Sequence, residues 1–336
     1  MATPIPILDV NALFGGECPA RRATDAAIRD AARDLGFLIL SGLPAALPLG
    51  PDARGELLRL LHLPAVEKRR LWRRSWAPEN PNVYRGYFPL EAGVIKEGFD
   101  VGPDPVARRL DDRGGDALAE STPMPPDESL PGWRELARRS FVALEQIGGA
   151  LMHALARGLG LPQGHFDDAF RAGNSTLRLM TYPTWPERSS AHGWPIRPVT
   201  DATGKQRYDI GGEHVDSGFV TLLQQDEVGG LQARIDEDTW VDVPPLERTL
   251  VVNFGKLLER WTGGRIRATE HRVLGNDAAR HSIAFFYEPR IDASIAPLPI
   301  EGAETFTPFA YGDHVWEAMS GFAEFANLER WADERE

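Results

Sequence analysis

The sequence has little cysteine: Cys18 is the only one among 336 residues. A single thiol excludes a disulfide within the chain, and it cannot by itself form a cysteine zinc site. Proteins without disulfides are typical of reducing compartments, in which ferrous iron also survives. The cysteine content therefore predicts a cytoplasmic protein.

Long apolar runs and an excess of basic residues are also missing. No stretch of about 18 apolar residues is present to span a bilayer, and the first residues lack the basic flank and apolar core of a signal peptide. The 49 acidic residues outnumber the 37 basic ones, which gives a formal charge of −12. This balance argues against nonspecific nucleic-acid binding and against an anionic membrane surface. We expect neither nucleic acid nor membrane as a partner.

The residues that are present suffice for a sizeable core, since 42% are hydrophobic and 26% charged. Helical spacing of apolar residues predicts helices over 24–34, 52–61, 64–73, 131–160, 256–261 and 313–333. Alternating or β-branched runs predict strands over 5–10, 37–40, 176–182, 219–224, 231–234, 240–243, 249–254, 265–273 and 282–287. Many short strands indicate a barrel or sandwich, and a jelly roll among these gathers ligands at its mouth.

Three turn-rich segments remain. The aromatic residues of 80–100 predict a packed cover over one end of the core, and 101–128 predict a long surface loop. Residues 184–209 form an irregular insertion, and loops of this length are usually functional or disordered. The pattern leaves open whether this insertion is a lid or a structural flap.

His214 and Asp216 stand two positions apart in the glycine-flanked run 211–218. In an extended strand, residues two apart point to the same face, so an imidazole and a carboxylate can aim at one point. With one more histidine, such a pair forms a facial triad that holds Fe(II) and leaves coordination positions open. A second His-x-Asp, at His165 and Asp167, falls between two predicted helices and is expected to be a surface or capping feature.

Arg280 and Ser282 have the same two-residue offset, so on a strand they also face one way. A guanidinium beside a hydroxyl suits the distal carboxylate of a dicarboxylic acid. His281 between them points to the opposite face and is a poor ligand candidate. Taken alone, Arg280 would be read as part of a surface salt bridge.

Together these motifs resemble the isopenicillin N synthase-like family of Fe(II)/2-oxoglutarate-dependent oxygenases. The resemblance extends over nearly the whole chain. Its most specific elements, in order, are His214-Val215-Asp216, the segment 225–232, Val252-Asn253-Phe254-Gly255, His271-Arg272-Val273 and Arg280-His281-Ser282. Lys256 and Glu270 depart from the family pattern, which commonly has an acidic residue and a proline at these positions.

The resemblance implies a mainly β fold, with a double-stranded β-helix (jelly-roll) core and flanking helices. Residues 1–128 would form an N-terminal support, and 129–336 the long helix, the oxygenase core and a last helix, within one compact unit. The family implies that His214, Asp216 and His271 hold iron. It also implies that 2-oxoglutarate binds iron through its keto acid end and Arg280 and Ser282 through its other carboxylate, with Tyr182 as a further donor.

The implied reaction uses O2, decarboxylates 2-oxoglutarate to succinate and CO2, and hydroxylates, desaturates or cyclises a small molecule. No catalytic side chain beyond the metal ligands is implied. Two alternatives stay open, an iron oxidase of the same family that does not use 2-oxoglutarate and a noncatalytic jelly-roll binding module. A zinc hydrolase with the same ligands would leave Arg280 and Ser282 without a role.

Five residues are candidates for substrate contact. The arginines among them favour an acidic or amino-acid-like substrate, although each could equally form a structural ion pair. The candidates are Arg85, Arg178, Trp185, Trp194 and Arg197.

Overall fold

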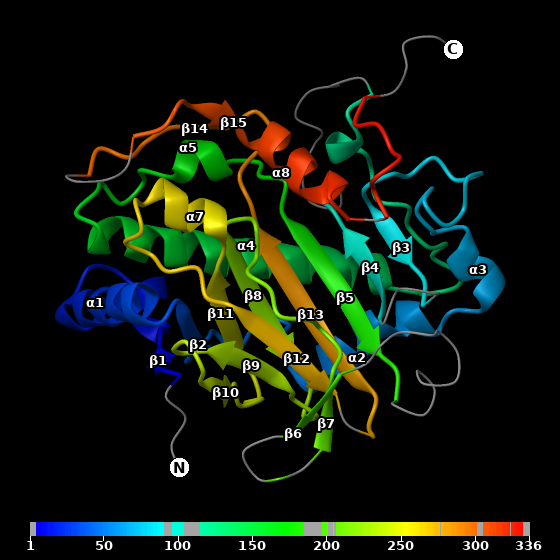
Figure 1. Ribbon diagram of the computed structural model, residues 1–336, viewed down its shortest axis with the longest axis horizontal. Helices are drawn as coiled ribbons and strands as arrows, with labels where there is room; N and C mark the ends of the chain where they lie inside the picture. Colours follow the sequence, from blue (N-terminus) through cyan, green and yellow to red (C-terminus); the bar gives the residue numbers. More distant parts are fainter. Residues whose placement is uncertain are drawn as a thin grey trace.

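The computed structural model describes residues 5–90, 96–103, 115–184, 197–200, 204, 206–275, 277–300, 305–322 and 324–331. Two β-sheets form its centre (Figure 1). The strands of the larger sheet are β1 (Ile7–Asp9), β2 (Phe37–Ser41), β3 (Gly86–Phe88), β4 (Glu97–Val101), β5 (Thr176–Tyr182), β8 (Val220–Gln225), β11 (Leu250–Phe254) and β13 (Arg280–Tyr287). The strands of the smaller sheet are β6 (Pro198–Thr200), β7 (Gln206–Asp209), β9 (Leu231–Arg234), β10 (Trp240–Asp242) and β12 (His271–Gly275).

The strand order shows how distant parts of the chain share one sheet. The larger sheet runs β1-β2-β11-β8-β13-β5-β4-β3, and the smaller one runs β10-β9-β12-β7-β6. The first four strands, from the N-terminal part of the chain, therefore occupy both edges of the larger sheet. A separate hairpin joins β14 (Ser294–Ile295) to β15 (Phe309–Ala310).

Helices cover the outer face of the larger sheet (Figure 1). The long helix α4 (Trp133–Gly158) buries an apolar stripe at helical spacing, as its sequence predicts. Its Phe141 meets Phe285 of β13 edge to face, with ring centres 5.0 Å apart. The other helices are α1 (Pro19–Asp34), α2 (Pro51–Leu58), α3 (Ala65–Arg69), α5 (Asp167–Phe170), α7 (Lys256–Trp261) and α8 (Tyr311–Ser320), with 3-10 turns at Asn11–Phe14, Arg59–His62 and Ala117–Ala119.

A second core fills the space between the two sheets. It joins Leu223 and Ala284 of the larger sheet to Ala233 and Val273 of the smaller one. The alternation along β5 explains the division, because successive side chains point to opposite faces. Leu177 and Leu179 belong to the outer core, whereas Met180 and Tyr182 belong to the inner one.

Several sequence-based expectations need correction, and one of them is the helix expected over 64–73, which is only Ala65–Arg69. Residues 80–100 are not only a cover, because they contribute β3 and β4 to the larger sheet. Residues 115–128 are not a surface loop, since Ala117 and Leu118 are buried and Asp116 pairs with Arg330. Strand β12 begins at His271 rather than at 265, and the last helix ends at Ser320.

Among the described residues, no helix combines the length and the apolar character that crossing a membrane requires.

Candidate functional site

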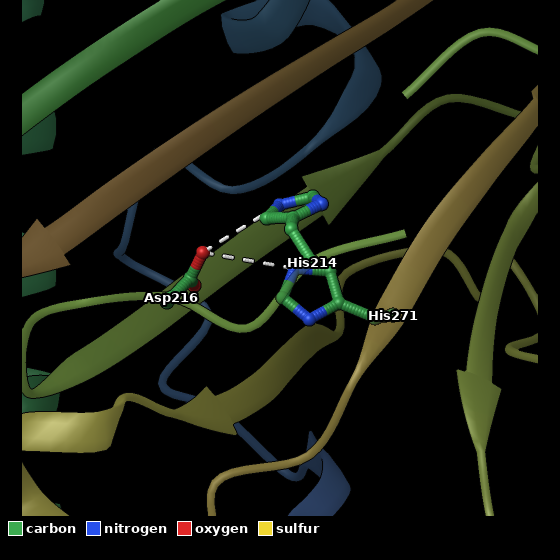
Figure 2. A group of neighbouring side chains, drawn as sticks. All are labelled: His214, Asp216 and His271. Carbon is green, nitrogen blue, oxygen red and sulfur yellow. Dashed lines mark ion pairs between the residues drawn. The ribbon is translucent and has the colours of Figure 1, made fainter. Parts of the chain in front are cut away.

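His214, Asp216 and His271 meet at one point between the sheets (Figure 2). Nε2 of each histidine lies 3.7 Å from Oδ1 of Asp216, and one ligand atom from each side chain lies within 4.8 Å of the others. Within the described ranges, these three form the one group of three or more potential metal-ligating side chains. The second His-x-Asp, at His165 and Asp167, does not converge on a metal site, because Asp167 bonds His153 instead, at 2.7 Å.

The backbone brings the two histidines together. The His214 amide donates to the His271 carbonyl at 3.0 Å, and the His271 amide donates back at 2.9 Å. His214 is held by this isolated bridge rather than by a strand such as the two-residue offset from Asp216 assumes, since β8 begins only at Val220. The imidazole orientation is also fixed, because Nδ1 of His214 lies 2.9 Å from the Gly212 carbonyl and Nδ1 of His271 lies 3.1 Å from the Thr269 carbonyl. Both Nε2 atoms are therefore left to face Asp216.

Asp216 is held from its other side. Its Oδ2 accepts hydrogen bonds from Asn253 of β11, at 2.7 Å, and from the Thr221 hydroxyl of β8. Although burial alone would raise the pKa of Asp216, the neighbouring His271 and His214, together with these hydrogen bonds, hold it below its usual range. The site therefore presents a carboxylate.

Burial and the neighbouring His271 lower the pKa of His214, and the charge of Lys96 contributes in the same direction. A neutral imidazole is the form that binds a metal. Two imidazole nitrogens and one carboxylate oxygen on one side of a point are the donor set of a facial triad for Fe(II). The three side chains therefore fit the predicted iron.

Arg280 is almost fully buried, with 1% of its surface exposed. Its Nε donates to the Gly229 carbonyl at 2.6 Å, and its Nη1 donates to the Ser282 hydroxyl at 3.2 Å. Nη2 is buried and has no hydrogen-bond partner among the described residues. The Tyr182 ring lies against this guanidinium, with 5.0 Å from its centre to Cζ. A buried cation with an unused donor fits an anionic ligand such as the distal carboxylate of 2-oxoglutarate.

As the alternation of side chains along a strand predicts, His281 lies on the opposite face of β13. His281 points away from Arg280 and Ser282, and its Nδ1 lies 2.7 Å from the Thr181 hydroxyl of β5.

Arg85, a substrate candidate, is fully buried. Its Nη1 donates to the Thr176 hydroxyl, and its Nη2 donates to the Asn174 side-chain oxygen at 2.9 Å and to the Asn174 carbonyl at 3.2 Å. These contacts join the chain before β3 to the start of β5. They occupy both terminal nitrogens of the Arg85 guanidinium.

Arg178 lies on the inner face of β5. Its Nε and Nη2 each donate to Asp100 at 2.7 Å, and Arg73 binds the same carboxylate. The Arg178 guanidinium also lies 5.4 Å from the centre of the Phe88 ring and 5.2 Å from that of Phe286. Arg178 therefore belongs to an ion-pair group at the edge of the inner core.

The remaining substrate candidates lie in or near the insertion. Arg197 is exposed, and its carbonyl accepts from the Asp209 amide at 3.0 Å. Trp185 and Trp194 lie outside the described residues, as does most of the candidate lid. The described part of the insertion forms β6 and β7, which extend the smaller sheet.

Comparisons with known proteins agree with this geometry. A family model described as the 2OG-Fe(II) oxygenase superfamily matches residues 175–289. Over 265 residues, the chain is 33% identical to the 2-oxoglutarate-dependent dioxygenase frbA of Dothideomycetidae sp. (strain 11243), covering 72% of this chain and 73% of that protein. The chain belongs to the 2OG-Fe(II) oxygenase superfamily.

Solved structures match the oxygenase over nearly its whole length. A full-length Neurospora crassa protein, crystallised in complex with alpha-KG and 5-formyluracil, gives a TM-score of 0.77 at 26% identity and covers 95% of this chain and 96% of its own. The dioxygenase for auxin oxidation in rice gives a TM-score of 0.67 at 26% identity, over 98% and 100% of the two chains. These similarities confirm the predicted double-stranded β-helix core.

The family assignment settles the reaction class. Members use Fe(II), 2-oxoglutarate and O2, so the oxygenase oxidises a small-molecule substrate while 2-oxoglutarate is decarboxylated to succinate and CO2. Neither the oxidase without 2-oxoglutarate nor the noncatalytic binding module gains support from these relatives.

Sequence reasoning missed several residues around the site. Asn253 lies in one of the family-like motifs and Thr221 in a predicted strand, but the sequence assigns a role in the site to neither. A polar side chain within a buried strand is the signal that marks both, because buried polar groups need partners. Lys96 and Asp100 stand in a turn-rich segment, and the sequence assigns a role in the site to neither.

Proposed function

We propose that this oxygenase holds Fe(II) through His214, Asp216 and His271, and holds 2-oxoglutarate through Arg280, Ser282 and Tyr182. The observation that carries the proposal is the convergence of three ligand atoms within 4.8 Å of one another. The buried Nη2 of Arg280, without a partner among the described residues, supports the cosubstrate part.

When bound, iron with 2-oxoglutarate and O2 supplies the power to oxidise an unactivated C–H bond. The protein has three tasks. The triad presents the Nε2 atoms of both imidazoles and one oxygen of the Asp216 carboxylate, so that all three can bind on one side of the metal. Arg280 and Ser282 orient the cosubstrate by its far end, and the inner core around Met180 and Ala284 excludes water from that end.

The substrate in this proposal is an acidic or amino-acid-like small molecule. Arg178 supports this, because its guanidinium lies over aromatic rings on the inner face and its Nη1 has no hydrogen bond to a described residue. Arg197, Trp185 and Trp194 remain proposed contacts from the insertion, whereas the buried contacts of Arg85 favour the structural alternative. The single Cys18 supports a cytoplasmic location.

Product stoichiometry tests the proposal. Purified protein with Fe(II) and 2-oxoglutarate is expected to form succinate and CO2 in step with O2 uptake, and a screen of small acids is expected to find compounds that accelerate this turnover. O2 uptake without succinate would instead support an oxidase that draws its electrons from substrate.

A further inference from the structure

Lys96 stands next to the cosubstrate side of the site. It directly precedes β4 and is half-buried, and its neighbour Glu97 pairs with Thr181 in the ladder between β4 and β5. Its Nζ lies 5.9 Å from the centre of the Tyr182 ring. Because the same ring lies against the Arg280 guanidinium, two cations flank one aromatic side chain on the inner face.

The other charges on this face have partners. Arg178 and Arg73 share the carboxylate of Asp100, and Arg73 also lies 3.4 Å from Glu324. Two cations and two carboxylates thus form a neutral group. Among the residues that the structure describes, no carboxylate pairs with Lys96.

The cosubstrate does not require this lysine either. In the proposed function, one end of 2-oxoglutarate binds iron and the other end binds Arg280 and Ser282. The charges of Fe(II), Asp216, dianionic 2-oxoglutarate and Arg280 then add up to zero. Lys96 is left as a single positive charge beside a loaded site, and a partly desolvated cation in that position favours binding of an anion.

We propose that the ammonium of Lys96 binds a carboxylate of the primary substrate, so that the oxygenase selects monoanionic acids over their uncharged analogues. This inference rests on the proposed function, because it assumes that the triad and Arg280 are occupied by iron and 2-oxoglutarate. It adds a lysine to the candidate substrate contacts, which in the sequence analysis are all arginines and tryptophans.

Binding in the absence of O2 tests the proposal. Benzoate, phenylacetate and indole-3-acetate, each beside its methyl ester, would be titrated by calorimetry into protein loaded with Fe(II) and 2-oxoglutarate. The variants are Lys96→Met, which keeps the length of the side chain, and Lys96→Arg, which keeps the charge. Lys68→Met is the matched control, because the ammonium of Lys68 pairs with Glu97 at 3.2 Å and with the Leu61 carbonyl at 3.0 Å.

The wild type is expected to bind at least one acid more tightly than its ester. Lys96→Met should weaken binding of that acid about tenfold, the loss expected for a charge-assisted hydrogen bond, and leave the ester unchanged. Lys96→Arg should retain most of the preference for the acid over its ester, and Lys68→Met should retain all of it. A second neutral variant, Lys96→Gln, repeats the measurement if Met perturbs the thermal unfolding of the protein.

Two results would overturn the proposal. One is equal binding of acids and esters by the wild type. The other is a loss of 2-oxoglutarate affinity in Lys96→Met with an unchanged preference for acids, which would assign the lysine to the cosubstrate. Failure of the wild type to bind 2-oxoglutarate at all would contradict the proposed function itself, so the two failures can be told apart.

Discussion

Nδ2 of Asn253 donates a hydrogen bond of 2.7 Å to Oδ2 of Asp216, while Oδ1 of the same carboxylate faces both histidines. One oxygen is thereby occupied by the protein and the other is left for a metal. A group that fixes a ligand in this way commonly changes metal affinity by a factor of about 10 to 100 when it is removed.

We therefore expect Asn253→Ala to weaken Fe(II) binding by about 10- to 100-fold, measured by titration without O2. Asn82→Ala is a matched control, because the side-chain amide of Asn82 bonds the Ser121 carbonyl at 2.7 Å and is not hydrogen-bonded to the triad. An Asn253 variant with wild-type iron affinity would show that this hydrogen bond does not orient the ligand.

Arg280→Gln should raise the KM for 2-oxoglutarate by about 100-fold, because a buried, positively charged hydrogen-bond donor for a carboxylate is lost. Iron affinity measured without 2-oxoglutarate should change little, since Arg280 does not touch the triad. The comparison variant Arg138→Gln loses an exposed ion pair with Glu135 on α4 and should behave as the wild type. Unchanged KM in the Arg280 variant would remove this residue from the cosubstrate site.

Glu288 should make the oxygenase less stable at alkaline pH. Burial raises its pKa to about 8, while its Oε1 accepts from the Phe219 amide at 3.2 Å. Between about pH 4.5 and 8 the folded state keeps a proton that the unfolded state has released, so the free energy of unfolding falls as pH rises through this window.

Glu288→Gln keeps an acceptor for Phe219 and abolishes this ionisation. It should be more stable than the wild type by roughly a few kcal/mol at about pH 9, and the difference should disappear near pH 4. Chemical unfolding across this range measures the effect, with the exposed Glu237→Gln as control. A stability difference that does not vary with pH would refute the proposed ionisation.

Arg85 should contribute to the stability of the fold rather than to substrate binding. Replacing it with Met leaves the oxygens of Asn174 and Thr176 without a donor, which should lower the free energy of unfolding by about 3 kcal/mol. The affinity for 2-oxoglutarate and the preference among small acids should persist in the folded fraction. A stable variant with altered substrate preference would restore Arg85 as a substrate contact.

Local patterns in the sequence predicted much of the architecture. β5 and β9 and helix α7 have the expected bounds, because each has a clear period and clear turn or cap signals at its ends. The two-residue offset of Arg280 and Ser282 also placed both on one face of β13, as the structure shows.

Long-range contacts account for what the sequence did not predict. Residues 86–88 and 97–101 have weak strand patterns, and they become strands because β5 offers them an edge. The bridge between His214 and His271 joins segments 57 positions apart, which no local pattern encodes. The partners of Arg85 and Arg178 are likewise distant in sequence. Composition alone therefore does not distinguish a structural role of these arginines from a role in substrate binding.

The most direct test is the Fe(II) stoichiometry of the wild type beside His214→Ala, Asp216→Ala and His271→Ala, titrated without O2. We predict one iron per chain for the wild type and no specific binding at the same concentrations for each variant. Wild-type stoichiometry and affinity in any of the three would contradict the assignment of the metal site.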